Sequence, residues 1–291
     1  HPFTNKIING LYPPGSVIKM GVALSFLENG IPDDFSVNCS GSLTIGNRNF
    51  RCWKSTGHGS VNFRKAIAES CDDFFYKGSL KLGINKISQT LGKLGFGEST
   101  GIDQINEFVG VNPNKEWKEK KYKEPWYVGE TVITSIGQGN MLVTPLQIAR
   151  YTGYLATGKL PKPHFYKANY EEPKELDIPS KYLDIMRKGM YDVSYSPKGT
   201  ANKHINSKIT IASKTGTAQV VSIPQSEKVR MKESELQYYE RSHAWITTYG
   251  PFENPQYVVT IIEEHGGHGG EAAGDVASKI YDKLQELGYI K

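Results

Sequence analysis

Ser16 and Lys19, near the start of the chain, have the spacing of a nucleophile and its base. They stand three residues apart at the start of a predicted apolar helix over residues 17–27, so their side chains share one face. Burial and the positive end of the helix dipole both favour a neutral lysine, which can accept the proton of a serine hydroxyl. The same spacing also fits a serine near a helix cap and a lysine that reaches water.

Ser70 and Asp72 form a second group, at an expected break between helices over residues 62–69 and 73–82. In an extended break, residues two apart point the same way. Ser70 and Asp72 would then face one cleft, while Cys71 faces the structure behind it. Taken alone, this segment is only a helix boundary.

The third group lies in a predicted strand over residues 208–222 and contains Lys214, Thr215, Gly216 and Thr217. On a strand, Lys214 and Gly216 share a face, where the lysine supplies charge and the glycine lets a substrate backbone lie close. An edge strand protected by a lysine against aggregation has the same appearance. Each group is weak alone, but all three in this order are a strong signal of serine nucleophile chemistry.

Composition and length indicate what kind of chain positions these three groups of residues. The chain has 291 residues, 38% hydrophobic and 22% charged, which is typical of a folded chain of one or two domains. No internal repeat stands out, so one domain over residues 1–291 is expected. The net charge of +5 is too small to argue for a nucleic-acid partner. The apolar stretch over residues 17–27 is too short to span a bilayer.

The order of the expected elements predicts an α+β fold, because helices come first and strands come late. Helices are expected over residues 17–27, 62–69, 73–82, 84–94, 145–156, 181–191 and 272–287, and strands over residues 208–222, 243–251 and 256–264. Four further segments are expected to be irregular: loop and short strands over residues 39–59, a solvated mixed-charge run at 115–121, a loop or short helix at 224–241, and a mobile glycine-rich turn at 264–271.

The three groups together resemble the penicillin-binding proteins, which share the S-x-x-K, S-x-N and K-T-G motif set with β-lactamases. Further segments are similar to the class B, elongation-type transpeptidases: Gly57-His58-Gly59, Trp126-Tyr127, Gly137-Gln138-Gly139, Thr144-Pro145-Leu146-Gln147 and His243-Ala244-Trp245. The resemblance implies a central antiparallel sheet flanked by helices, with an all-helical subdomain. It also implies that a membrane anchor, a pedestal domain and the first strands precede His1, so that the chain is an N-terminally truncated transpeptidase domain.

The resemblance assigns roles to the site residues. Ser16 would attack the penultimate D-Ala of a peptidoglycan stem peptide, with Lys19 as base and Ser70 relaying a proton. Lys214 would set the field around Ser70, and Asp72 stands where most of the family has Asn. Substrate binding would fall to residues of the third motif, namely Thr215, Gly216 and Thr217. No cofactor is expected for catalysis.

The resemblance also implies partners and a location. β-Lactams would acylate Ser16, and a rod-shape-determining scaffold protein and a membrane glycosyltransferase are the expected partners, with no nucleic acid. The domain would lie on the periplasmic side of the cell inner membrane. Two alternatives stay open: a serine β-lactamase or β-lactam sensor, and a non-catalytic cell-wall scaffold.

The three cysteines, Cys39, Cys52 and Cys71, form with His58 a set at spacings of thirteen, six and thirteen. Three thiolates and an imidazole can close a tetrahedral structural zinc site, and related elongation-type enzymes also carry metal-capable residues in this region. An exported location would instead favour one disulfide and an odd thiol. Structural zinc, a disulfide and free thiols all stay open at this point.

Overall fold

The structure is a computed structural model that describes residues 3–220 and 233–290. Half of the charged and aromatic segment expected as a loop or short helix over residues 224–241, namely residues 224–232, lies outside the described residues. Its remaining part contains two short 3₁₀ turns, η3 (Glu233–Glu235) and η4 (Tyr238–Glu240).

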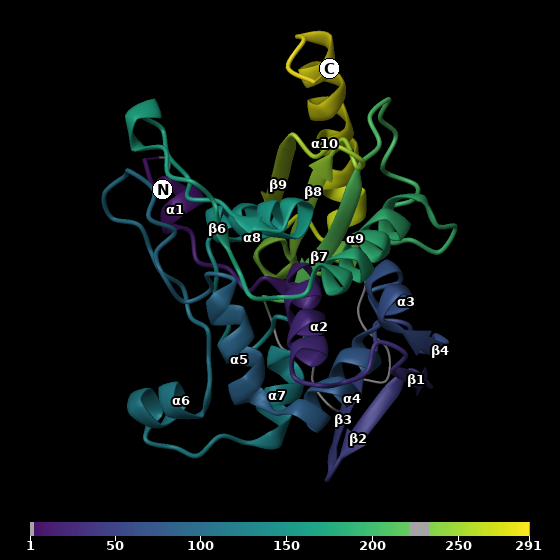
Figure 1. Ribbon diagram of the computed structural model, residues 1–291. Helices are drawn as coiled ribbons and strands as arrows, with labels where there is room; N and C mark the ends of the chain where they lie inside the picture. Colours follow the sequence, from purple (N-terminus) through teal and green to yellow (C-terminus); the bar gives the residue numbers. More distant parts are fainter. Residues whose placement is uncertain (1–2, 221–232, 291) are drawn as a thin grey trace.

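A three-stranded antiparallel sheet stands at the centre of the upper part of Figure 1. Its strands are β7 (Ala212–Ala218), β8 (His243–Gly250) and β9 (Tyr257–Glu263), in the order β7-β8-β9. The three predicted strands and the α+β class are therefore confirmed, although β7 is shorter than the predicted segment. Trp245, Ile246 and Tyr249 of β8 are fully buried, which places the core on both sides of this strand.

Helices cover the two faces of this sheet. The Thr248 hydroxyl of β8 lies 3.0 Å from the Tyr281 hydroxyl of α10 (Gly269–Glu286). The adjacent Thr247 lies 2.7 Å from the hydroxyl of Thr152 in α8 (Pro145–Thr157). Because neighbouring residues of a strand point to opposite faces, α10 and α8 lie on opposite sides.

A group of helices lies below the sheet, packed around α2 (Lys19–Glu28) (Figure 1). The helices α3 (Phe63–Ala68), α4 (Asp72–Leu82) and α5 (Ile84–Lys93) contact α2 directly, and α7 (Val128–Thr134) packs on α4. The predicted helices are confirmed for α3, α4 and α5, and also for α8 and α9 (Ser180–Tyr195). A short α1 (Lys6–Asn9) precedes them. Residues 19–27 of α2 are all buried, as their apolar character predicts.

Short strand pairs accompany this helical group, as expected for residues 39–59. β1 (Ser36–Cys39) pairs with β4 (Gly59–Asn62), and β2 (Ser42–Ile45) pairs with β3 (Arg48–Arg51), both antiparallel. A third pair joins β5 (Lys159–Leu160) to β6 (Lys174–Glu175). The helical subdomain is thus not purely helical, because two strand pairs pack on α4.

Two segments differ from the sequence-based expectation. The mixed-charge run forms a helix, α6 (Lys115–Tyr122), because the Asn114 side chain caps it by accepting from Trp117 N, and Glu116 pairs with Lys120 one turn later. The last helix begins at Gly269, three residues before the predicted start. A side chain at that position would overlap the Trp245 carbonyl oxygen, so the helix reaches the sheet there only with a glycine.

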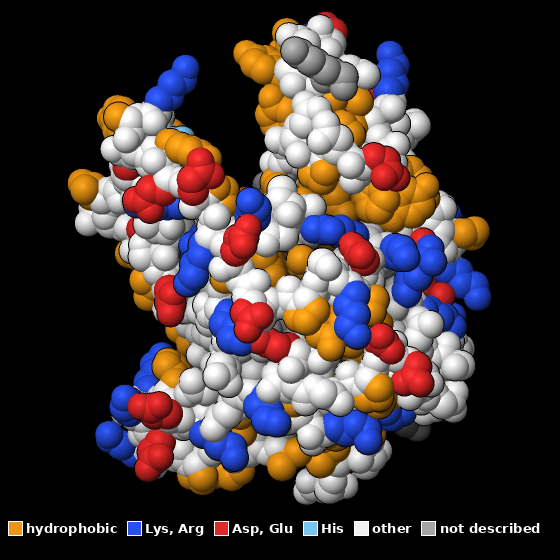
Figure 2. All heavy atoms as spheres, in the orientation of Figure 1, with side chains coloured by type: hydrophobic (Ala, Val, Ile, Leu, Met, Phe, Trp, Pro, Cys, Tyr) orange, Lys and Arg blue, Asp and Glu red, His pale blue; other side chains and the backbone are white. Residues whose placement is uncertain are grey.

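None of the helices in the described residues combines the length and the apolar character that crossing a bilayer demands. Figure 2 shows lysine and arginine side chains interspersed with acidic ones over the face that it displays.

Candidate active site

Ser16 lies in a 3₁₀ turn, η1 (Gly15–Ile18), that leads directly into α2. The turn is held from two sides. Gly15 N donates to the Gly137 carbonyl oxygen at 2.9 Å, and a Cβ on Gly15 would stand 2.8 Å from the Thr217 carbonyl oxygen of β7. Gly15 has a φ of +54°, a left-handed conformation that favours glycine. Ser16 is therefore fixed, still partly exposed, between the start of α2 and the end of β7.

Lys19 is completely buried and makes three polar contacts. Its Nζ donates to Asp72 Oδ1 at 2.6 Å, to the Ser70 carbonyl oxygen at 2.9 Å and to Ser70 Oγ at 3.2 Å. The helix itself is apolar, as predicted, but a carboxylate more than fifty residues away in sequence forms an ion pair with this lysine. From its own helix alone, Lys19 would be expected to be an amine with only apolar neighbours. In the structure its amine instead pairs with the Asp72 carboxylate.

Ser70 lies at the break between α3 and α4, but the break is not extended as expected. Ser70 has a φ of +51°, which is uncommon for a residue with a side chain. Cys71 is the extended residue, and Asp72 already begins α4. The left-handed turn turns the side chains of Ser70 and Asp72 toward Lys19, whereas Cys71 contributes to a cluster of sulfur atoms.

Lys214 approaches the same hydroxyl from the sheet. Its Nζ lies 2.9 Å from Ser70 Oγ and 2.9 Å from the Thr215 carbonyl oxygen. Complete burial, together with the charge of nearby Lys19, lowers the pKa of Lys214 well below its ordinary value. Burial thus favours the neutral form of Lys214, and its expected role as a source of positive charge around Ser70 stays a prediction. Ser70 Oγ stands between two buried lysine amines.

Asp72, an acid at the position where the resemblance leads us to expect Asn, accepts two hydrogen bonds. Oδ1 accepts from Lys19 Nζ at 2.6 Å, and Oδ2 accepts from the Trp53 backbone N–H at 2.9 Å. Since both neighbours are donors, both side-chain oxygens must be acceptors. An amide would turn its NH₂ group toward one of the donors, which explains why an acid suits this chain.

We predict that Asp72→Asn lowers the rate of acylation by a β-lactam about tenfold or more, because one hydrogen bond is replaced by an unfavourable donor–donor contact. Stopped-flow acylation kinetics with a chromogenic cephalosporin measure this rate. The exposed Asp34 provides the control, since Asp34→Asn makes the same chemical change on the surface. Equal rates for Asp72→Asn and wild type would contradict this account of the acid.

The third motif packs against the Ser16 turn. A Cβ on Gly216 would stand 3.0 Å from Val17 Cγ1 and 3.2 Å from the Pro14 carbonyl oxygen. Gly216 therefore allows close packing of β7 on this turn, and its expected role in the approach of a substrate backbone stays a prediction. Thr215 is buried, with its hydroxyl 2.6 Å from Thr200 Oγ1, while Thr217 stays partly exposed.

Sequence reasoning missed two residues beside the site. Thr200 binds the Thr215 hydroxyl, and no sequence pattern singles it out. Trp53 contacts Asp72 through its backbone, and its only signal in the sequence is its place next to Cys52. The Gln138 side chain, from a segment already noted for its resemblance, donates to the Thr217 carbonyl oxygen at 3.3 Å.

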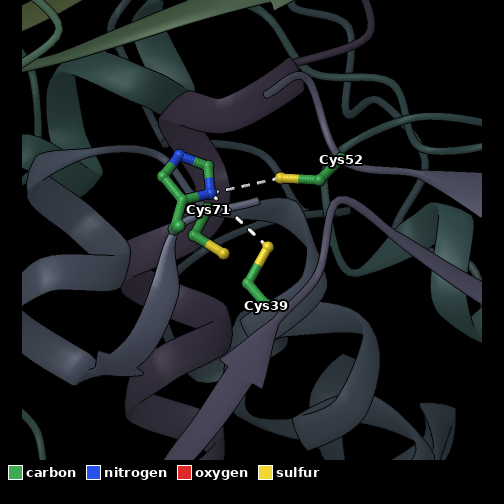
Figure 3. A group of neighbouring side chains, drawn as sticks. Cys39, Cys52 and Cys71 are labelled. Carbon is green, nitrogen blue, oxygen red and sulfur yellow. Dashed lines mark hydrogen bonds between the residues drawn. The ribbon is translucent and has the colours of Figure 1, made fainter. Parts of the chain in front are cut away.

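The cysteines and His58 form one buried cluster in which all four ligand atoms lie within 4.8 Å of one another. Figure 3 shows the sulfur atoms of Cys39 and Cys52 turned toward one imidazole nitrogen, with Cys71 beside them. His58 Nδ1 lies 3.5 Å from each of these two sulfur atoms. All three cysteines are free of disulfides.

These distances fit a tetrahedral metal centre. A Zn–S bond of about 2.3 Å and a Zn–N bond of about 2.05 Å place sulfur and nitrogen about 3.6 Å apart at the tetrahedral angle. The pKa of Cys52 is lowered by hydrogen bonding from Cys71, whereas the pKa of Cys71 is raised by the same contact and by burial, and burial also raises the pKa of Cys39. A bound metal ion would take the place of the remaining thiol protons. The donor set and its geometry are therefore suited to zinc.

The antiparallel sheet with helices on both faces, and the Ser70 hydroxyl between two buried lysines beside the start of a buried helix, agree with the resemblance to the penicillin-binding proteins. The family model described as "Penicillin binding protein transpeptidase domain" matches residues 1–282. The chain thus belongs to the penicillin-binding protein transpeptidase family.

Individual relatives agree with this assignment. The chain is 36% identical over 297 residues to the peptidoglycan D,D-transpeptidase MrdA of Haemophilus influenzae, covering 97% of this chain and 45% of the relative. A complex between penicillin-binding protein PBP2 and MreC from Helicobacter pylori matches with a TM-score of 0.92 and 47% identity, covering 99% of this chain and 52% of that chain.

Pseudomonas aeruginosa PBP2 in complex with WCK 5153 matches with a TM-score of 0.85 and 33% identity, covering 97% of this chain and 62% of that chain. The chain spans about half the length of the curated relatives that it matches.

Proposed function

We propose that the protein is a peptidoglycan D,D-transpeptidase that cross-links stem peptides during cell elongation, through an acyl-enzyme on Ser16. The observation that carries the proposal is the position of Ser70 Oγ, between the amines of Lys19 and Lys214. Residues 1–291 would act as one transpeptidase domain.

In acylation, Ser16 Oγ attacks the carbonyl carbon of the penultimate D-Ala while its proton passes to Lys19, the nearest buried base along the helix. Because Lys19 forms an ion pair with Asp72, it must first give up one proton before it can accept the proton of Ser16. Ser70 Oγ provides the path, because it contacts both lysine amines and Lys214 can accept a proton in its neutral form. The C–N bond then breaks, and the relayed proton leaves with the terminal D-Ala amine.

The negative oxygen that develops in this step needs hydrogen-bond donors. We assign this role to the backbone N–H groups of Ser16 and Thr217, since the Ser16 turn and the end of β7 lie against each other. Loss of one such donor costs about 10²–10³ in rate in comparable enzymes. Thr217 is also our candidate for holding the substrate carboxylate. Thr215, whose hydroxyl already bonds Thr200, would have to exchange that contact to do the same.

Transfer to an amine from a second stem peptide completes the cross-link and releases Ser16. A β-lactam that mimics D-Ala-D-Ala would acylate Ser16 and remain attached. The family indicates no cofactor for this chemistry. We propose that Cys39, Cys52, His58 and Cys71 hold a structural zinc ion, which would fix the turn before Asp72 without entering the reaction.

The family also suggests where and with whom the protein works. A relative at 47% identity was solved in complex with MreC. We propose a scaffold protein of this kind and a membrane glycosyltransferase as partners, on the periplasmic side of the inner membrane. A β-lactamase would use the same acylation and differ only in fast hydrolysis, so the lifetime of the penicilloyl adduct on Ser16 tests the proposal.

We predict a pH dependence for acylation that arises from Lys214. Its pKa lies below the ordinary 10.5 because the amine is buried beside Lys19. As the pH falls through this lowered pKa, Lys214 gains a proton and can no longer accept one from Ser70, so the acylation rate decreases. The pH profile of acylation measures this limb.

The variant Lys214→Arg provides the comparison, because a guanidinium keeps its charge over the whole range. This limb should disappear from its profile. A wild-type profile that is flat up to pH 10, or an identical limb in Lys214→Arg, would contradict the role of Lys214 as proton acceptor.

A further inference from the structure

Trp53 makes two hydrogen bonds that reach either side of the Ser70 turn. Its indole Nε1–H donates to the Glu69 carbonyl oxygen at 3.0 Å, and its backbone N–H donates to Asp72 Oδ2 at 2.9 Å. Glu69 immediately precedes Ser70, and Asp72 follows it by two residues. One residue from a different part of the chain thus holds both ends of the turn that carries Ser70.

This turn needs external support. Ser70 has a φ of +51°, a conformation that costs free energy for a residue with a side chain and persists only where its surroundings enforce it. Within the turn, Ser70 N and Cys71 N donate to carbonyl oxygens of α3. Trp53 supplies contacts from outside that helix, and these set the turn against Lys19 and Lys214.

Trp53 itself is anchored on the opposite side. The backbone N–H of the preceding Cys52 donates to the Gly41 carbonyl oxygen at 2.8 Å. The Trp53 ring packs edge-on against the His58 ring, with 5.4 Å between the ring centroids. Trp53 as a residue is nevertheless 52% exposed. Burial of its ring therefore explains little of its position, whereas the two hydrogen bonds explain it directly.

We propose that Trp53 is a positioning residue for acylation: its indole N–H fixes the Glu69 carbonyl and thereby the orientation of Ser70 Oγ between the two lysines. This inference rests on the proposed acyltransfer. Trp53 touches neither Ser16 nor the reacting carbonyl in this role, so it acts through Ser70. The effect should fall on the chemical step and spare the initial binding of a β-lactam.

The experiment compares Trp53→Phe with wild type in pre-steady-state acylation by a penicillin, which separates the dissociation constant from the acylation rate constant. Trp53→Phe keeps the backbone N–H to Asp72 and removes only the indole donor. We expect the acylation rate constant to fall about fivefold, as one hydrogen bond predicts, with the dissociation constant unchanged within about twofold. Trp117→Phe on α6, a partly exposed tryptophan in another region, should retain the wild-type rate.

A second variant protects the test against general destabilisation. Replacing the Trp53 indole by benzothiophene, through an incorporated amino acid, keeps the ring size and removes the N–H, and should reproduce the loss in rate at the wild-type Tm. A wild-type acylation rate in either variant would overturn the inference alone. A wild-type protein that is not acylated at all would overturn the proposed function and the inference with it.

Discussion

Ser16→Ala will abolish covalent labelling by penicillin. The hydroxyl oxygen is the only atom of this side chain that can form the acyl bond, and none of Lys19, Ser70 and Lys214 can replace it. Removal of a catalytic serine typically lowers the rate by about 10⁴-fold or more, which here means no detectable adduct. Labelling with a fluorescent penicillin, followed on a denaturing gel, measures the effect.

The fold should survive this change because Ser16 is partly exposed in its turn and Gly15 continues to hold the chain against β7. The Tm of Ser16→Ala should therefore match that of wild type within about 2 °C. Ser60→Ala, at an exposed position on β4, is the matched control and should label normally. Persistent labelling of Ser16→Ala would show that another residue is the nucleophile.

His58→Ala will remove bound zinc and destabilise the helical subdomain. The purified wild-type protein should contain one zinc ion per chain, because four ligand atoms lie within 4.8 Å of one another. Structural zinc contributes several kcal/mol to folding, so we expect the Tm of His58→Ala to be about 10 °C or more lower. Metal analysis by mass spectrometry and differential scanning calorimetry measure the two effects.

Acylation should also slow in His58→Ala. Cys71 stands between Ser70 and Asp72, so loss of the metal would loosen the segment that holds these two residues. The exposed His164, whose Nδ1 lies 3.3 Å from the Lys162 carbonyl oxygen, supplies the control variant His164→Ala. Dialysis of wild type against a strong chelator should reproduce the loss of stability, and zinc should restore it. A metal-free wild type with three titratable thiols and the same Tm as His58→Ala would eliminate the site.

Local sequence patterns predicted most of the fold. The apolar run of α2 and the strands β7, β8 and β9 follow from hydrophobic periodicity and from residue type. The α6 helix was not predicted, because a run of mixed charges is typical of a solvated surface segment. Its stability comes from the Asn114 cap and the Glu116–Lys120 ion pair.

The sequence identifies candidate site residues, but it does not predict how their side chains contact one another. Ser16, Lys19, Ser70 and Lys214 stand out by type and spacing. Hydrogen bonds bring Lys19, Ser70 and Lys214 together, and Ser16 lies in the turn that leads into the helix of Lys19, while their roles stay predictions. The ion pair of Lys19 with Asp72 joins residues 53 positions apart, and no local pattern contains it. The left-handed Ser70 turn and the contacts of Trp53 likewise depend on tertiary packing.

Our central claim is that Ser16 forms a long-lived acyl-enzyme, and native mass spectrometry of the intact protein after penicillin addition tests it most directly. We predict one adduct with the full mass of penicillin that persists for hours, together with the mass of one zinc ion, and that maps to the peptide containing Ser16. No adduct, an adduct on another residue, or an adduct that disappears within minutes as penicilloic acid accumulates would contradict it.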